Sequence, residues 1–93
     1  MPPSAQDLPI GNYTEETPIR SSVELGAIIR EQRKRLALKQ LDLAGLGNTG
    51  NRFIVDLENG KPTVQLQKVL DLMDLLGLEV VVRTKASRSA PAL

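Results

Sequence analysis

The chain has 93 residues, a formal net charge of +1, and neither cysteine nor histidine. This length fits one small domain with a marginal hydrophobic core, and the missing residue types exclude disulfides and the usual ligands of structural zinc. No apolar run reaches the roughly 18–20 residues that cross a bilayer, and the N-terminus lacks the basic and apolar regions of a signal peptide, so we expect a cytoplasmic protein.

The first twenty residues are rich in proline, serine and threonine, with prolines at positions 2, 3, 9 and 18. They contain few apolar residues and show no hydrophobic periodicity. Because such a composition does not form a packed core, we expect residues 1–20 to be a flexible arm.

A first helix is predicted to begin after Ser21 or Ser22 and to end near Leu36. Ser21 and Glu24 match a capping box, in which the hydroxyl and the carboxylate each accept a hydrogen bond from a free amide. The expected buried face comprises Leu25, Ile28, Ile29, Gln32 and Leu36. The opposite face comprises Ala27, Arg30 and Lys34.

A second, shorter helix fits Gln40–Leu46, and residues 47–50 (Gly-Asn-Thr-Gly) read as a turn after it. The expected buried residues of this helix are Leu43, Ala44 and Leu46. A third helix fits Asn51–Asn59, and Gly60 is expected to end it in a left-handed conformation. Its expected buried face comprises Phe53, Ile54 and Leu57.

A fourth helix is predicted to have Pro62 in its first turn and Thr63 as its cap, and to run to about Leu76 with Gly77 as its stop. Its apolar residues form two stripes. One stripe comprises Leu66, Val69, Leu70, Met73 and Leu76, and the other comprises Val64, Leu72 and Leu75. A helix with two apolar faces needs two burial partners, and we expect the second partner to be another copy of the chain rather than a larger core.

The only convincing strand is at residues 78–84 (Leu-Glu-Val-Val-Val-Arg-Thr), where β-branched residues favour an extended backbone. A single strand leaves its backbone groups unpaired, and the simplest partner is the same strand of a second subunit, antiparallel about a two-fold axis. We therefore expect a homodimer, and we expect residues 86–93 to be a disordered tail. The expected dimer interface comprises Val64, Leu72, Leu75, Leu78, Val80, Val81 and Val82.

Two short helices joined by a glycine-containing turn, within a four-helix domain, describe a helix-turn-helix. In this motif the first helix crosses the phosphate backbone of DNA, and the second places its N-terminal residues in the major groove. We expect Gly50 to permit close backbone approach, Asn51 to bind adenine edges, and Arg52 to bind guanine or phosphate. Val55, one turn further on, is expected to be exposed and to contact a thymine methyl group.

Phosphate contacts are expected at the start of the second helix and just after the third helix. Lys39 and Gln40 lie at the start of the second helix, where free amides and the helix dipole favour an anion, and Lys61 follows the third helix. The glycine-containing turn is not a P-loop, because no strand precedes it and no Lys-Ser or Lys-Thr follows it. The carboxylates are scattered over expected helix surfaces, so we expect no catalytic residue, no cofactor and no metal.

Several short motifs occur together between residues 22 and 77. They are Leu25-Gly26, Ile29, Arg33, Leu38-Lys39-Gln40, Leu43-Ala44 and residues 53–61, Phe-Ile-Val-Asp-Leu-Glu-Asn-Gly-Lys. Together they resemble the Xre/Cro repressor family. Residues 50–53 (Gly-Asn-Arg-Phe) and 60–66 (Gly-Lys-Pro-Thr-Val-Gln-Leu), followed by the strand, are more narrowly similar to HipB-type antitoxins.

The resemblance implies an all-α, lambda-repressor-like bundle of four to five helices, with the C-terminal strand pairing across a homodimer. It implies that the protein represses its own operon by binding operator DNA, and that it binds a HipA-like serine/threonine kinase toxin. It also implies that Arg33 pairs with Glu58 and ties the first helix to the third.

The chain departs from the family at the expected DNA surface. Lys39 stands where the family usually has threonine, Leu41 stands at a commonly acidic position, and Gly50-Asn51 replaces the usual Ser-Arg. Base preference therefore does not carry over from relatives. Two other functions stay open, namely a stand-alone Xre-type repressor and a protein-interaction module without DNA binding. The expected organisation is an arm at 1–20, a DNA-binding domain at 21–77, a dimerisation strand at 78–85 and the tail at 86–93.

Overall fold

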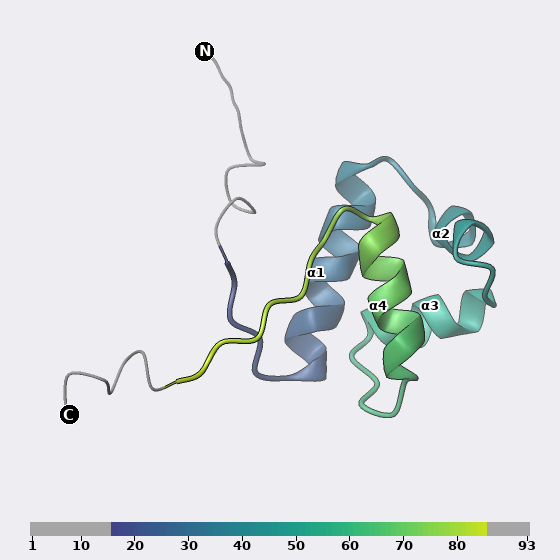
Figure 1. The fold of residues 1–93 in the computed structure, drawn as a ribbon. Helices are drawn as coiled ribbons and strands as arrows, with labels where there is room; N and C mark the ends of the chain where they lie inside the picture. Colours follow the sequence, from purple (N-terminus) through teal and green to yellow (C-terminus); the bar gives the residue numbers. More distant parts are fainter. Residues whose placement is uncertain (1–15, 86–93) are drawn as a thin grey trace, which may run out of the picture.

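The computed structural model describes residues 16–85, and this part of the chain forms four α-helices and no strand (Figure 1). The helices are α1 (Ser22–Arg35), α2 (Gln40–Leu46), α3 (Asn51–Glu58) and α4 (Leu66–Leu75). The expected all-α class is therefore confirmed for the described residues. Residues 1–15 of the expected arm and the whole expected tail lie outside the described range.

Helix α1 begins where the capping residues predict. The Ser21 hydroxyl accepts a hydrogen bond from the Glu24 amide at 3.1 Å, and the Glu24 carboxylate accepts one from the Arg20 amide at 2.6 Å. The helix ends at Arg35, and Leu36 is 46% exposed, so its predicted burial is wrong. Leu36 lies just past the last helical turn, where it no longer follows the buried stripe.

The hydrophobic core takes side chains from all four helices. Its largest fully buried members are Ile29, Leu43, Ile54, Leu72 and Leu76. Leu25, Leu38, Phe53, Val64 and Leu78 are partly buried and pack against it. The predicted burial of Leu46 is wrong, because this residue ends α2 and is 60% exposed.

The turn between α2 and α3 is closed by an asparagine rather than by a glycine. Asn48 adopts a left-handed conformation with φ 53°, and the Thr49 amide donates to the Ala44 carbonyl at 2.9 Å. Gly47 is needed for packing instead, since a Cβ there would lie 2.5 Å from Leu72 Cδ2. Gly60 has φ 85° and ends α3 as predicted.

Helix α4 begins four residues later than the predicted Pro62 start. Pro62 and Thr63 lie in a turn, Gln65 is the extended cap residue, and the first helical residue is Leu66. From this turn Val64 packs against the core. Helix α4 ends close to the predicted point, and Gly77 has φ 77°.

The buried stripe of α4 differs from the prediction. Val69, Leu72, Met73 and Leu76 are buried, at the spacing that one helix face requires. Leu72 is 2% exposed within its own chain, so its place in the expected dimer interface is wrong. Leu66 is 68% exposed, so its predicted place on the buried stripe is wrong, whereas Leu75 is 49% exposed and stays available to a second chain.

The segment after α4 is extended and crosses toward the start of the described chain (Figure 1). Leu78 is partly buried against the core, whereas Val80, Val81 and Val82 are exposed. Arg83 pairs with Glu16 at 2.8 Å. The predicted strand forms no ladder within the described part of this single chain, and its pairing with a second subunit stays a prediction.

Candidate nucleic-acid interface

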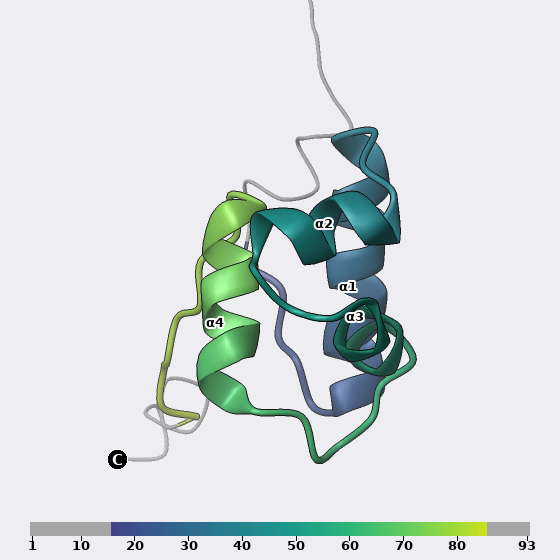
Figure 2. The same ribbon diagram turned by 90° about the vertical axis from the view of Figure 1, so that its right-hand side faces the viewer.

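Helices α2 and α3 lie on the same side of the molecule, with α3 in contact with both α1 and α2 (Figure 2). The two short helices are joined by four residues, 47–50. This is the arrangement of a helix-turn-helix, in which the second helix presents its first turn to solvent. The predicted DNA-binding residues therefore belong to one side of the molecule, at the start of α2, at the start of α3 and just after α3.

The first turn of α3 is exposed. Gly50 is the extended cap residue and a Cβ there would meet open space, and Asn51 and Arg52 are both exposed. Ile54 and Leu57 of the same helix are buried, so the core fixes which face of α3 turns outward. Val55 is partly buried rather than exposed as predicted, since it lies beside Ile54 at the edge of the buried face.

Asp56 contacts two of the predicted DNA-binding cations, and sequence reasoning missed it. Its carboxylate lies 3.3 Å from Arg52 Nε and 3.5 Å from Lys61 Nζ. The signal was present, because an acid four residues after an arginine lies beside it on a helix surface. The contact between Asp56 and Lys61 depends on the turn after α3, so no helical spacing predicts it.

At the start of α2, the amide of Lys39 is already bound within the chain. The Asp42 carboxylate accepts its hydrogen bond at 2.8 Å, and this acid lies where a phosphate was expected to meet free amides. The Lys39 side chain is exposed. Gln40 is partly buried, and its side-chain amide donates to Glu58 at 3.1 Å, so Gln40 joins α2 to α3 as well as lying at the expected surface.

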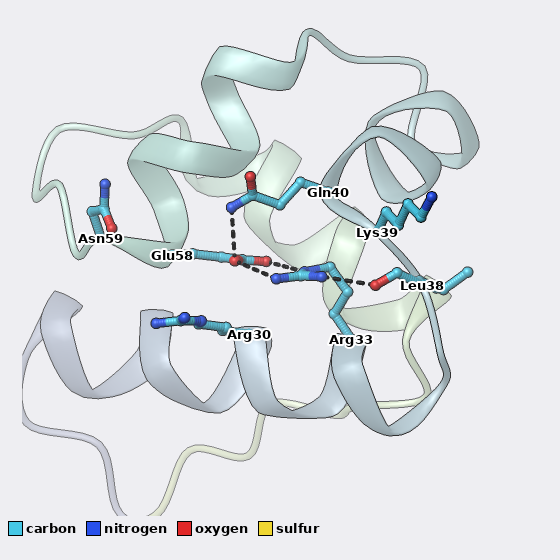
Figure 3. A pocket seen from close by; sticks show the side chains of 7 residues that line it. All are labelled: Arg30, Arg33, Leu38, Lys39, Gln40, Glu58 and Asn59. Carbon is cyan, nitrogen blue, oxygen red and sulfur yellow. Dashed lines mark hydrogen bonds and ion pairs between the residues drawn. The ribbon is translucent and has the colours of Figure 1, made fainter.

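The predicted ion pair between Arg33 and Glu58 is present (Figure 3). Arg33 donates from Nε and from a terminal nitrogen to the two Glu58 oxygens, at 2.6 and 3.0 Å. The other terminal nitrogen donates to the Leu38 carbonyl at 2.7 Å. We call Arg33, Leu38, Gln40 and Glu58 the Glu58 network. It connects α1, the loop after α1, α2 and α3, and thereby fixes how α3 is presented.

An open hollow lies over the Glu58 network (Figure 3). Its lining comprises Arg30, Arg33, Leu38, Lys39, Gln40, Glu58 and Asn59. Arg30 and Asn59 lie on one side of the ion pair and Lys39 on the other (Figure 3). Glu58 neutralises Arg33, so Arg30 and Lys39 remain as exposed cations at the hollow. The sequence placed Arg30 on the outward face of the first helix, and gave no signal for Asn59.

Residues 16–85 contain no helix long and apolar enough to cross a membrane. Within the same range, no three potential metal-binding side chains lie together.

No protein-family model matches the chain. The chain is 43% identical over 70 residues to y4mF, an HTH-type transcriptional regulator of Sinorhizobium fredii, and the match covers 75% of this chain and 92% of the relative. Among solved structures, HipB in a HipB-O4 20mer complex aligns with a TM-score of 0.68 at 18% identity. A chain of a HipA-HipB-O2-O3 complex aligns with a TM-score of 0.69 at 18% identity, and each alignment covers 75% of this chain and 99% of the other. The chain therefore belongs to the family of helix-turn-helix transcriptional regulators, and its fold is like that of HipB.

Proposed function

We propose that this protein is a sequence-specific DNA-binding repressor that acts as a homodimer. The observation that carries the proposal is the exposed first turn of α3, with Asn51 and Arg52 turned outward by the buried Ile54 and Leu57. Both outward side chains have the donors that read base edges in a major groove. The HipB structures that share this fold are named as complexes with 20mers, which supports DNA as the ligand.

In the proposed mechanism α3 of each subunit enters one of two successive major grooves, about 34–36 Å apart. Gly50 lets the backbone approach the groove, since nothing in the chain fills the space at its Cβ position. Lys61, Lys39 and Arg30 contact phosphates on either side, and the last two use the hollow over the Glu58 network. Bound protein then blocks transcription sterically, and the affinity falls as salt rises.

A homodimer supplies the second α3. In this proposal residues 21–77 form the DNA-binding domain and residues 78–85 form the dimerisation strand. The exposed residues Leu75, Val80, Val81 and Val82 support it, because a pair of such segments would bury apolar surface and satisfy backbone groups together. Val64 and Leu78 are already partly buried against the core of their own chain, so less of their surface is available to a second chain.

The more specific proposal is an antitoxin that represses its own operon and binds a HipA-like serine/threonine kinase. The specific observation that favours it is the chain of matching fold in a HipA-HipB-O2-O3 complex. A kinase-like gene next to this one, and a complex of the two products on co-expression, are the expected findings. The absence of both would favour a stand-alone repressor.

The test of DNA reading is operator binding by Arg52→Ala and Asn51→Ala, measured with the DNA upstream of the protein's own gene. Each substitution is expected to weaken binding by about 1–3 kcal/mol, because each removes a contact to a base edge. Lys34→Ala is the control, since it removes an exposed cation that belongs neither to α3 nor to the lining of the hollow over the Glu58 network. Unchanged affinity in both α3 variants would favour a protein-interaction module instead.

A further inference from the structure

Asp56 lies between two cations of the proposed DNA surface. One of its carboxylate oxygens lies 3.3 Å from Arg52 Nε, and the other lies 3.5 Å from Lys61 Nζ. The side chain of Asp56 is 23% exposed, whereas those of Arg52 and Lys61 are 86% and 53% exposed. One shielded carboxylate therefore serves two exposed cations, one at the start of α3 and one in the turn after it.

The position of Asp56 is unfavourable for an acid on helix grounds alone. It is the third residue from the end of α3, where the helix dipole disfavours a negative charge. Asparagine in its place would relieve this repulsion, so loss of the carboxylate is not expected to unfold the helix. The effect of the carboxylate is instead expected in what Arg52 and Lys61 do.

The contact between Arg52 and Asp56 is made at Nε, on a side chain that is 86% exposed. The terminal nitrogens of the guanidinium are the donors suited to the paired acceptors of a guanine edge. A guanidinium so held loses less conformational freedom when it meets the correct base. The same carboxylate repels phosphates and partly neutralises both cations, and this weakens attraction to DNA of any sequence.

We propose that Asp56 is a positioning residue that sets DNA selectivity by holding Arg52 and Lys61 in the free protein. This inference rests on the proposed DNA-binding function. Binding to random DNA draws only on charge and is weakened by Asp56. Binding to the operator uses the oriented guanidinium and is supported by it.

The test compares Asp56→Asn, Asp56→Glu and Asp74→Asn with the unmodified protein. Asp74→Asn is the matched control, because it makes the same change in net charge at an exposed residue of α4, outside α2 and α3. Fluorescence anisotropy would measure binding to a short random-sequence duplex and to the upstream DNA over a series of sodium chloride concentrations. Thermal melting would check that all variants are folded.

Asp56→Asn is expected to bind the random duplex about two- to fivefold more tightly than Asp74→Asn at low salt. The slope of log affinity against log salt should steepen by up to about 0.9, the value for one added charge. The ratio of operator affinity to random-duplex affinity should fall. Asp56→Glu, which keeps the charge, should restore both the slope and most of the ratio.

Equal affinity of Asp56→Asn and Asp74→Asn for the random duplex, or weaker binding by Asp56→Asn, would overturn the role of Asp56 and leave the proposed function standing. An unchanged operator-to-random ratio in Asp56→Asn would do the same. If the unmodified protein binds neither duplex at low salt, the proposed function fails, and this inference fails with it.

Discussion

The side chain of Glu58 is 2% exposed, and its two oxygens accept hydrogen bonds from α1 and from α2. A charge in such a place is tolerated because Arg33 compensates it with a two-point contact and Gln40 satisfies a further acceptor site. The attraction within the pair is largely offset by the loss of hydration. Its main effect is on geometry, because the carboxylate of α3 is joined to α1 and to α2 at the same time.

Glu58→Gln is expected to lower the free energy of unfolding by about 3–5 kcal/mol, because it leaves the Arg33 charge buried without an acid. Urea denaturation measures the loss. Asp74→Asn, at an exposed acid, should stay within about 0.5 kcal/mol of the unmodified protein. The double variant Arg33→Met with Glu58→Leu should lose clearly less stability than the sum of the losses of the single variants Arg33→Met and Glu58→Leu. Additive losses would show that the pair has no coupled role.

At the scale of the helices, α1 and α3 approach each other closely at Gly26. A Cβ at this position would lie 2.4 Å from the Leu57 carbonyl oxygen and 2.9 Å from that of Glu58. The absence of a side chain therefore lets α1 reach the backbone of α3 where the Glu58 network begins. Gly45 in α2 is different, because it is exposed and a Cβ there would meet nothing within 4 Å.

These two glycines give opposite predictions for the same substitution. Gly26→Ala is expected to destabilise the fold by about 1–3 kcal/mol through overpacking of the interface between α1 and α3. Gly45→Ala is expected to stabilise it by about 0.5–1 kcal/mol, because alanine is the better residue within a helix. Thermal or urea denaturation of both variants provides the check. A stabilised Gly26→Ala would mean that α1 and α3 are further apart than described.

The positions of the helices were predictable because local signals mark their ends. Ser21 and Glu24 start α1, and Gly60 and Gly77 stop the third and fourth helices with positive φ. The start of α4 was predicted wrongly, because Pro62 suits a turn as well as a first helical turn. Burial of leucines at helix ends was the other failure, since it depends on where neighbouring helices stop. The residues concerned are Leu36, Leu46 and Leu66.

The candidate site was predictable in its location and less so in its contacts. The turn and the helix signals placed Asn51 and Arg52 at the exposed start of α3. The contacts of Gln40 with Glu58 and of Asp56 with Lys61 were not visible in the sequence, because each joins side chains of different elements. The spacing of Arg52 and Asp56 was visible and was missed. The Arg33–Glu58 pair came from family resemblance and not from spacing.

At the scale of the whole molecule, the segment after Gly77 would join the two subunits of the proposed dimer and so set the distance between their α3 helices. Val81→Pro removes a backbone donor that an intersubunit ladder would need, whereas Val81→Ala keeps it. The proline variant is expected to shift the molar mass by light scattering toward that of one 10.1 kDa chain, and the alanine variant to shift it much less. A dimer that persists in Val81→Pro would exclude an essential strand-mediated interface.

The Glu58 network lies at the inner end of α3, while Asn51 and Arg52 lie at its outer end and take no part in the core. Orientation and readout are therefore assigned to different residues of one eight-residue helix. A substitution at the outer end would, under the proposed function, alter which bases suit the helix without altering how the core holds the helix. Under the proposed function, the protein and its operator can then diverge together over evolution, by single exchanges that cost the fold little stability.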